Sequence, residues 1–182
     1  MPNPLEVIRT YLRAKDENRP HLMASAFESS ARLEVRMRTD TISFPPVTTG
    51  LEAITQVLVR DFARTYENVY TFCLTDEPED AFPSFRCGWL VGMSEKATGS
   101  VRVGCGTYDW SFQAERPYLA KRLTIDIEVM KVLSADALGP VMAWLTMLPY
   151  PWCPVPIAIR ELPGVPELAE IREFVGRVSE SN

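Results

Sequence analysis

The sequence predicts an α+β domain in which a curved antiparallel sheet wraps around N-terminal helices and leaves a pocket. Amphipathic helical stretches occupy the start of the chain, and segments with alternating apolar residues follow them. The 182 residues suit one domain, and a domain of this size buries roughly two thirds of the surface of its unfolded chain. A core this large leaves room for a cavity, so the order of elements favours a pocket for a small molecule.

Three helical stretches are expected before the long strands. The first begins at Pro4, a residue favoured at helix starts, and repeats apolar side chains at helical spacing as far as Leu12. The charged segment DENRP breaks it, as a solvated turn or an internal ion pair, and Pro20 starts a short second helix. Gly50 precedes the third, LEAITQVLVRDFARTYENV, whose apolar stripe should press against a sheet.

Alternation within the strands predicts which side chains share a face of the sheet. A shorter strand around Tyr70 to Leu74 precedes a long hairpin closed by the turn SEKATG, and a further strand follows the hairpin. The expected inward faces are, in chain order, Ala31, Leu33, Val35 and Met37; Phe85, Cys87, Trp89, Val91 and Met93; Val101, Val103, Cys105, Thr107 and Asp109; and Leu123, Ile125, Ile127 and Val129.

The opposite face of the hairpin is expected to form an apolar patch that needs a cover. One cover is a second copy of the chain, which predicts a homodimer through the outer sheet face. The other is the proline-rich and helical extension of residues 134–182, which follows the domain of residues 1–133 and is too apolar for a free tail. This extension should pack on the same domain or on a dimer partner. The patch comprises Gly88, Leu90, Gly92, Gly104, Gly106, Tyr108, Trp110 and Phe112.

The composition argues against two kinds of partner. The net charge is -5, whereas nucleic-acid binding needs clustered lysine and arginine, so no nucleic-acid partner is expected. No apolar run approaches the roughly 20 residues that cross a bilayer, and the first residues lack the apolar core of a signal peptide. The sequence therefore predicts a cytoplasmic protein with no membrane partner.

The cysteine and histidine content predicts neither a metal site nor a cofactor. The four cysteines show no CxxC spacing and the chain has one histidine, so no tetrahedral zinc set can be assembled. Reduced, mostly buried thiols are expected, although Cys87 and Cys105 would face each other across the hairpin and leave a redox pair as an alternative.

The order of helix, short helix, strand, helix after a glycine, hairpin and final strand resembles the NTF2-like superfamily, specifically its SnoaL-like branch. The resemblance covers roughly residues 4–133 and rests on VIRTYLRAKDENRPHLMASAFESSARLEV, TTGLEAITQVLVRDF, VGCGTYDWSFQ and LTIDIEVMKVL. It implies a cone-shaped α+β domain with a curved antiparallel sheet, a pocket between sheet and helices, and frequent dimers. The superfamily includes isomerases, cyclases, dehydratases and noncatalytic members.

The ketosteroid isomerase site of this superfamily uses a tyrosine and a protonated aspartic acid as donors, plus a carboxylate base. By this resemblance the tyrosine corresponds to Tyr11 and the protonated acid to Asp109. The base position falls on Val35, and Glu34 beside it should point to the other face, so the proton-abstracting group is missing. His21 is a further candidate acid or base because imidazole titrates near neutral pH.

These observations predict a pocket for a small apolar or aromatic ligand that carries a carbonyl or hydroxyl group. Isomerase, lyase or cyclase chemistry would follow if the protein is an enzyme. The alternative is a noncatalytic ligand-binding or dimeric interaction module, and a third reading is an accessory subunit resembling the small subunit of aromatic-ring dioxygenases. The expected pocket-lining residues are Val35, Met37, Phe62, Trp89, Val103, Cys105 and Ile125.

Overall fold

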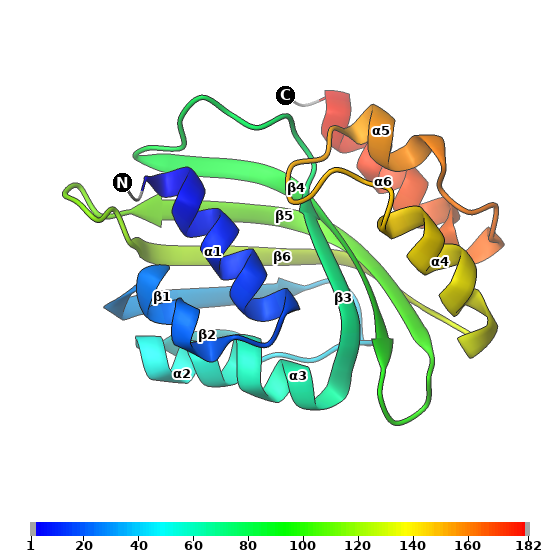
Figure 1. Cartoon of the computed structure of the whole chain (residues 1–182), viewed down its shortest axis with the longest axis horizontal. Helices are drawn as coiled ribbons and strands as arrows, with labels where there is room; N and C mark the ends of the chain where they lie inside the picture. The colour runs from blue at the N-terminus through cyan, green and yellow to red at the C-terminus, as the bar shows by residue number, and fades with distance from the viewer. Residues whose placement is uncertain (1–2, 181–182) are drawn as a thin grey trace.

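A computed structural model describes residues 3–180 and confirms the predicted α+β class (Figure 1). One sheet has the strand order β2-β1-β6-β5-β4-β3. The strands are β1 (Phe27–Met37), β2 (Val47–Thr49), β3 (Tyr66–Cys73), β4 (Ser84–Glu95), β5 (Val101–Phe112) and β6 (Ala120–Leu133). The helices are α1 (Pro4–Asp16), η1 (Pro20–Ser25), α2 (Leu51–Thr55), η2 (Gln56–Asp61), α3 (Phe62–Thr65), η3 (Ala135–Ala137), α4 (Leu138–Leu145), α5 (Val155–Arg160), η4 (Pro166–Leu168) and α6 (Ala169–Glu180).

Helix α1 begins at Pro4, as the sequence predicts. The side chain of Asn3 caps it by accepting the backbone N–H of Glu6 at 2.9 Å, which satisfies one of the free donors at the helix start. The apolar face of α1 is fully buried against the sheet, and Figure 1 shows the helix lying across the strands. This placement brings Tyr11 and Lys15, which lie one helical turn apart, to the inner face of the sheet.

The third helical stretch is shorter than predicted. Helical structure runs from Leu51 to Thr65 through α2, the π-helical turn η2 and α3, and strand β3 begins at Tyr66. The predicted helix extended to Val69, and the strand was expected only around Tyr70. The segment YENVY contains aromatic and β-branched residues that favour a strand, and pairing with β4 decides the conformation here.

Four of the five strand pairs are antiparallel, and β1 pairs with β6 in parallel. A bulge interrupts the β5–β6 ladder, because Cys105 pairs with Val129 while Gly106 pairs with Ile127. Glu128 is the extra residue, and it shifts the alternation by one, so that the inward side chain after Ile127 is Met130 and not Val129. Val129 therefore packs with the outer cluster, and its predicted inward position is wrong.

The predicted faces of β5 are inverted. Tyr108, Trp110 and Phe112 belong to the inner cluster with α1, whereas Val101 and Val103 belong to the outer one. Both faces are largely buried over residues 101–106, so alternation there does not distinguish inside from outside. Beyond Gly106 the outward positions Thr107, Asp109 and Ser111 are polar and less buried, and they alternate with the inward Tyr108, Trp110 and Phe112. Cross-strand pairing of Trp89 with Gly106 fixes the register: a Cβ on Gly106 would lie 2.8 Å from the Trp89 ring and 1.8 Å from the Asp126 carbonyl oxygen.

The C-terminal extension covers the outer face of β3, β4 and β5. Helices α4, α5 and α6 pack there in a cluster that contains Leu90, Trp144 and Leu145, and they gather together away from α1 in Figure 1. The approach at Gly92 is close, because a Cβ on this residue would lie 2.1 Å from Leu145 Cδ1. The apolar patch on which the homodimer was predicted is thus not exposed: its outward members lie under the extension, and Gly104, Gly106, Tyr108, Trp110 and Phe112 face inward.

The extension also extends the sheet beyond β3. The Cys73 N–H donates to the Pro151 carbonyl at 2.7 Å, and the Cys153 N–H donates to the Cys73 carbonyl at 2.9 Å. Trp152, between these two bonds, reaches into the inner cluster. No helix within residues 3–180 is long and apolar enough to cross a membrane.

Candidate functional site

A small cavity of about 50 Å³ lies between α1, the α2–α3 helix and the inner face of the sheet. Its apolar lining comes from β1, β4, β6, the helical residues Leu58 and Phe62, and the loop residues Ile42 and Phe44. Its polar lining comes from α1, β3, β4 and β5, which contribute Tyr11, Lys15, Thr71, Trp89 and Tyr108. The polar side chains therefore meet in one otherwise apolar enclosure.

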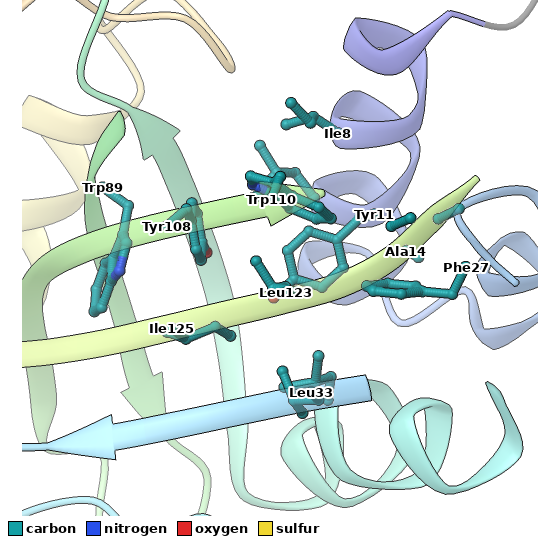
Figure 2. Packing of buried hydrophobic residues seen from close by; sticks show 14 of the residues in the cluster. Ile8, Tyr11, Ala14, Phe27, Leu33, Trp89, Tyr108, Trp110, Leu123 and Ile125 are labelled. Atoms are coloured by element: carbon teal, nitrogen blue, oxygen red, sulfur yellow. The ribbon is translucent and has the colours of Figure 1, made fainter. Parts of the chain in front are cut away.

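The Trp89 indole N–H is buried and has no hydrogen-bond partner. The Tyr11 hydroxyl is also buried, and its interaction with the Tyr108 hydroxyl affects the pKa values of both groups. Figure 2 shows Tyr11 pointing from α1 toward the sheet, where Tyr108 and Trp110 lie. The Tyr11 ring meets the Trp110 and Tyr108 rings edge to face at 5.2 Å and 6.2 Å. Both hydroxyls stay protonated at neutral pH, because burial raises the pKa of Tyr11 and of Tyr108 well above the ordinary value.

Lys15 brings a positive charge to the cavity as part of a buried network. Its ammonium donates to Asp16 Oδ1 at 2.8 Å and to Thr71 Oγ1 at 2.7 Å, and it lies 4.9 Å from the centre of the Phe62 ring. An ammonium has three N–H donors, so these two bonds leave one for another acceptor. The side chains of Lys15 and Asp16 are only 7% and 4% exposed.

The carboxylate of Asp16 is fully occupied by donors from three elements. Besides Lys15, it accepts the Thr71 N–H at 2.8 Å, the Thr71 hydroxyl at 2.8 Å and the Tyr150 hydroxyl at 3.0 Å. Burial, followed by the Asp16 charge, raises the pKa of Tyr150, which keeps this donor protonated. The charged break predicted after the first helix thus holds an internal ion pair, and Asp16 has little capacity left to act as a base.

The cavity offers donors and lacks a strong acceptor. None of the residues that line it within the described chain is an aspartate, a glutamate or a histidine. Val35, at the position where the resemblance would place the base, lines the cavity with an apolar side chain. The arrangement can therefore hold an acceptor oxygen and stabilise negative charge on it, but its lining supplies no carboxylate or imidazole to remove a proton.

Two predicted catalytic residues lie away from the cavity. Asp109 is exposed on the outer face of β5, opposite Arg86 and Thr124 in the strand register, so its predicted position on the buried apolar face is wrong. The cause is the inverted face assignment of β5. His21 is exposed in the short helix η1 and does not line the cavity.

Three predicted pocket-lining residues also lie elsewhere. Val103 and Cys105 are on the outer face under the C-terminal helices, again because the faces of β5 are inverted. Met37 is at the end of β1, where its side chain is 36% exposed. The predicted residues that the structure does bring together around the cavity are Tyr11, Val35, Phe62, Trp89 and Ile125.

Sequence reasoning missed Lys15, Thr71 and Tyr108. The spacing of Lys15 four residues after Tyr11 was a usable signal, because such a pair shares one helix face. Thr71 lay within the expected strand around Tyr70, but nothing in the sequence singled it out. Tyr108 was assigned to the outer face together with its neighbours on β5.

The cysteines form no redox pair across the hairpin, because Cys87 belongs to the inner cluster and Cys105 to the outer one. All four are free and buried. Contact with Cys87, then burial, raises the pKa of Cys73 well above its ordinary value, and burial raises the pKa of Cys105 to about 12. No group of three or more histidine, cysteine, aspartate or glutamate side chains within residues 3–180 could hold a metal ion.

The geometry of the sheet and helices defines the class: this chain has the NTF2-like fold, as the sequence predicts. Neither a family model nor a curated protein matches the sequence. Among solved structures, an NTF2-like protein from Burkholderia thailandensis E264 matches with a TM-score of 0.54 and 11% identity over 72% of this chain and 92% of that one.

Two further structures show the same fold. LinA matches with a TM-score of 0.54 and 11% identity over 70% of this chain and 84% of its own. A protein with a ketosteroid isomerase-like fold from Catenulispora acidiphila DSM 44928, solved in complex with trimethylamine, matches with a TM-score of 0.51 and 13% identity over 66% of this chain and 83% of that one. Similarity at these identities concerns the fold alone.

Proposed function

We propose that the cavity binds a small, largely apolar molecule through an acceptor oxygen, such as that of a carbonyl or hydroxyl group. The observation that carries this proposal is that the Trp89 N–H, a buried donor without a partner, lines the same cavity as the Tyr11 hydroxyl and as Lys15, which has one N–H left to donate. A buried donor without a partner costs about 1–3 kcal/mol. A ligand oxygen would recover this free energy, while a purely apolar ligand would not.

Ligand binding without catalysis is better supported than acid/base catalysis. The lining has hydrogen-bond donors but no carboxylate or imidazole, and Asp16 is occupied by four donor groups. Isomerase, lyase or cyclase chemistry stays a second candidate because Lys15 and Tyr11 together would stabilise negative charge on an oxygen. The SnoaL-like branch, within the NTF2-like fold, stays a prediction from the sequence segments quoted above.

Two probes of nearly equal size that suit a cavity of about 50 Å³ test the acceptor oxygen: acetone, which has a carbonyl, and isobutene, which has none. We expect acetone to bind the native protein at least about fivefold more tightly, as one net hydrogen bond of about 1 kcal/mol requires. Replacing Tyr11 by Phe or Trp89 by Phe should reduce this preference. Dissociation constants from titrations followed by NMR measure it.

The matched control is Tyr70→Phe, which removes a hydroxyl beside the outer cluster and away from the cavity. It should leave the preference for acetone unchanged. Equal affinities of the native protein for the two probes, or a preference that survives both Tyr11→Phe and Trp89→Phe, would contradict the proposal. Native mass spectra of the purified protein would in addition reveal a retained natural ligand.

A further inference from the structure

A second hollow adjoins the cavity. This cleft of about 420 Å³ lies between residues 40–45 and the helical residues Val57, Asp61, Phe62 and Thr65. The cavity and the cleft have three lining residues in common: Ile42, Phe44 and Phe62. The two spaces are therefore separated only by side chains that contribute to both.

We propose that the cavity and the cleft are two compartments of one ligand site, which takes an elongated apolar molecule with an oxygen at its inner end. The oxygen meets Tyr11, Lys15 and Trp89, and the remainder of the molecule passes Phe44 and Phe62 into the cleft. This inference rests on the proposed function and specifies its ligand. The cavity of about 50 Å³ is too small for such a molecule, since pockets for drug-sized ligands have volumes of about 300–1,000 Å³.

The boundary between the compartments is a pair of aromatic rings. Phe44 and Phe62 are nearly parallel, with an interplanar angle of 17° and ring centres 6.5 Å apart. Phe62 belongs to the helical wall, where its ring also packs against Tyr66 at 5.0 Å. It directly follows the π-helical turn Gln56–Asp61, and turns of this kind are rare and frequent at functional sites. Phe44 belongs to the loop between β1 and β2, so the two rings can separate when the loop moves.

The loop is held at both ends and unattached between them. The Thr41 hydroxyl donates to the Met130 carbonyl at 2.6 Å, and Arg102 donates to the Thr41 carbonyl. At the other end, the Val35 N–H donates to the Pro46 carbonyl at 3.0 Å. Within the described chain, no hydrogen bond involves residues 42–45. Phe44 can therefore move outward without breaking a backbone hydrogen bond, which keeps the cost of opening low.

The charge of the cleft limits what the outer end of the ligand can be. Asp40 and Asp61 are the charged residues among those that line the cleft in the described chain. Arg64 pairs with Asp61 at 3.3 Å, so the charge of Asp40 is the main one that would repel a ligand carboxylate there. The geometry therefore favours aryl or alkyl ketones and alcohols whose outer end is neutral or basic.

A series of phenyl ketones tests the proposal: acetophenone, butyrophenone and hexanophenone. If the added methylenes enter the cleft, the affinity should rise about fourfold for each one that is buried. Val57→Ala, at a residue that lines the cleft and not the cavity, should reduce this gain for hexanophenone and leave acetophenone binding nearly unchanged. Phe82→Ala is the matched control, because Phe82 is 42% exposed and lies outside both compartments.

Alkylbenzenes of matched length separate this inference from the proposed function. A gain with length in both series without any preference for ketones would overturn the oxygen recognition and support the two compartments. Acetophenone binding with an affinity that falls or stays flat as the chain grows would overturn the two compartments and leave the oxygen recognition intact.

Xenon provides a second measurement that needs no oxygen, because apolar cavities bind it. The rate at which xenon exchanges between solution and cavity can be measured by xenon NMR. Phe44→Ala should raise this rate several-fold, whereas Phe82→Ala should not. An exchange rate that is unaffected by Phe44→Ala would overturn the role of the ring pair as the entrance, whether or not any ketone binds.

Discussion

The two faces of the sheet bury similar apolar side chains, but they differ in whether their buried polar groups have hydrogen-bond partners. On the outer face, the Trp144 N–H donates to the Ala158 carbonyl at 2.8 Å. On the inner face, Trp89, Trp110 and Trp152 all have a buried indole N–H without a partner, and no such side chain occurs in the outer cluster of the described chain. Buried polar groups are normally paired. The difference indicates that the outer cluster satisfies its buried polar groups, whereas the inner one leaves buried donors unpaired, which lowers stability and is compatible with the ligand site proposed above.

If the outer cluster serves stability, truncating its central tryptophan should have the largest effect. We expect Trp144→Ala to lower the free energy of unfolding by about 3–5 kcal/mol, since it removes a buried ring and leaves a cavity. Chemical denaturation measures this loss. The control is Met147→Ala, at a side chain that is 74% exposed, with an expected change within about 0.5 kcal/mol. A loss at Trp144 as small as that at Met147 would mean that the extension contributes little to folding.

Lys15→Met tests whether the charged network on the inner face is as buried as its contacts indicate. We expect a loss of about 3 kcal/mol, because the change leaves the Asp16 carboxylate buried without its cation. This loss of stability should be small for the removal of one partner of a buried ion pair, because Thr71 and Tyr150 still donate hydrogen bonds to the Asp16 carboxylate. Lys121→Met, at an exposed lysine on β6, is the control in the same denaturation experiment. Equal stability of the two variants would contradict a buried ion pair.

The pH dependence of stability reports on the buried hydroxyl of Tyr11. Its pKa is raised in the folded state, so above pH 10, the approximate pKa in the unfolded chain, the unfolded state loses this proton first. Stability should therefore be unaffected by this group below pH 10 and fall by about 1.4 kcal/mol per pH unit above it. Tyr11→Phe should flatten the decline between pH 10 and 11 by that amount. Parallel declines for the native protein and the variant would show that the hydroxyl ionises while the protein stays folded.

How well the sequence predicts the inward face of a strand depends on whether the outer face of that strand is exposed or buried. In β1 the outward positions Arg32 and Arg36 are charged, so alternation identified Leu33 and Val35 as inward. In β5 the first half is buried on both faces and gives no such signal, and the apolar Val101, Val103 and Cys105 there led to the wrong assignment. The polar residues Thr107, Asp109 and Ser111 in the second half mark the outward face, and the pairing of Gly106 with Trp89 across β4 fixes the register.

The candidate site was predictable only in part for a related reason. Tyr11 and Phe62 follow from helical periodicity, which identifies buried positions. Lys15 was not recognised because a lysine on a helix usually extends its charge into solvent. Here Asp16 and Thr71 hold the charge inside, and the contact between Asp16 and Thr71 joins residues 55 positions apart in the chain. Such a contact depends on the complete fold.

The two faces can be compared most directly by making the same substitution, tryptophan to phenylalanine, on each. We expect these substitutions to have the smallest effects on stability. Trp89→Phe and Trp144→Phe remove similar volumes, so their packing losses should largely cancel in the difference. Trp144→Phe also breaks a hydrogen bond and leaves the Ala158 carbonyl unpaired, whereas Trp89→Phe removes a donor that had no partner. We expect Trp144→Phe to be less stable than Trp89→Phe by about 1–3 kcal/mol. If the two variants were equally stable, the Trp89 N–H would have to be satisfied in solution, and the inner face would lose the unpaired donor that distinguishes it from the outer one.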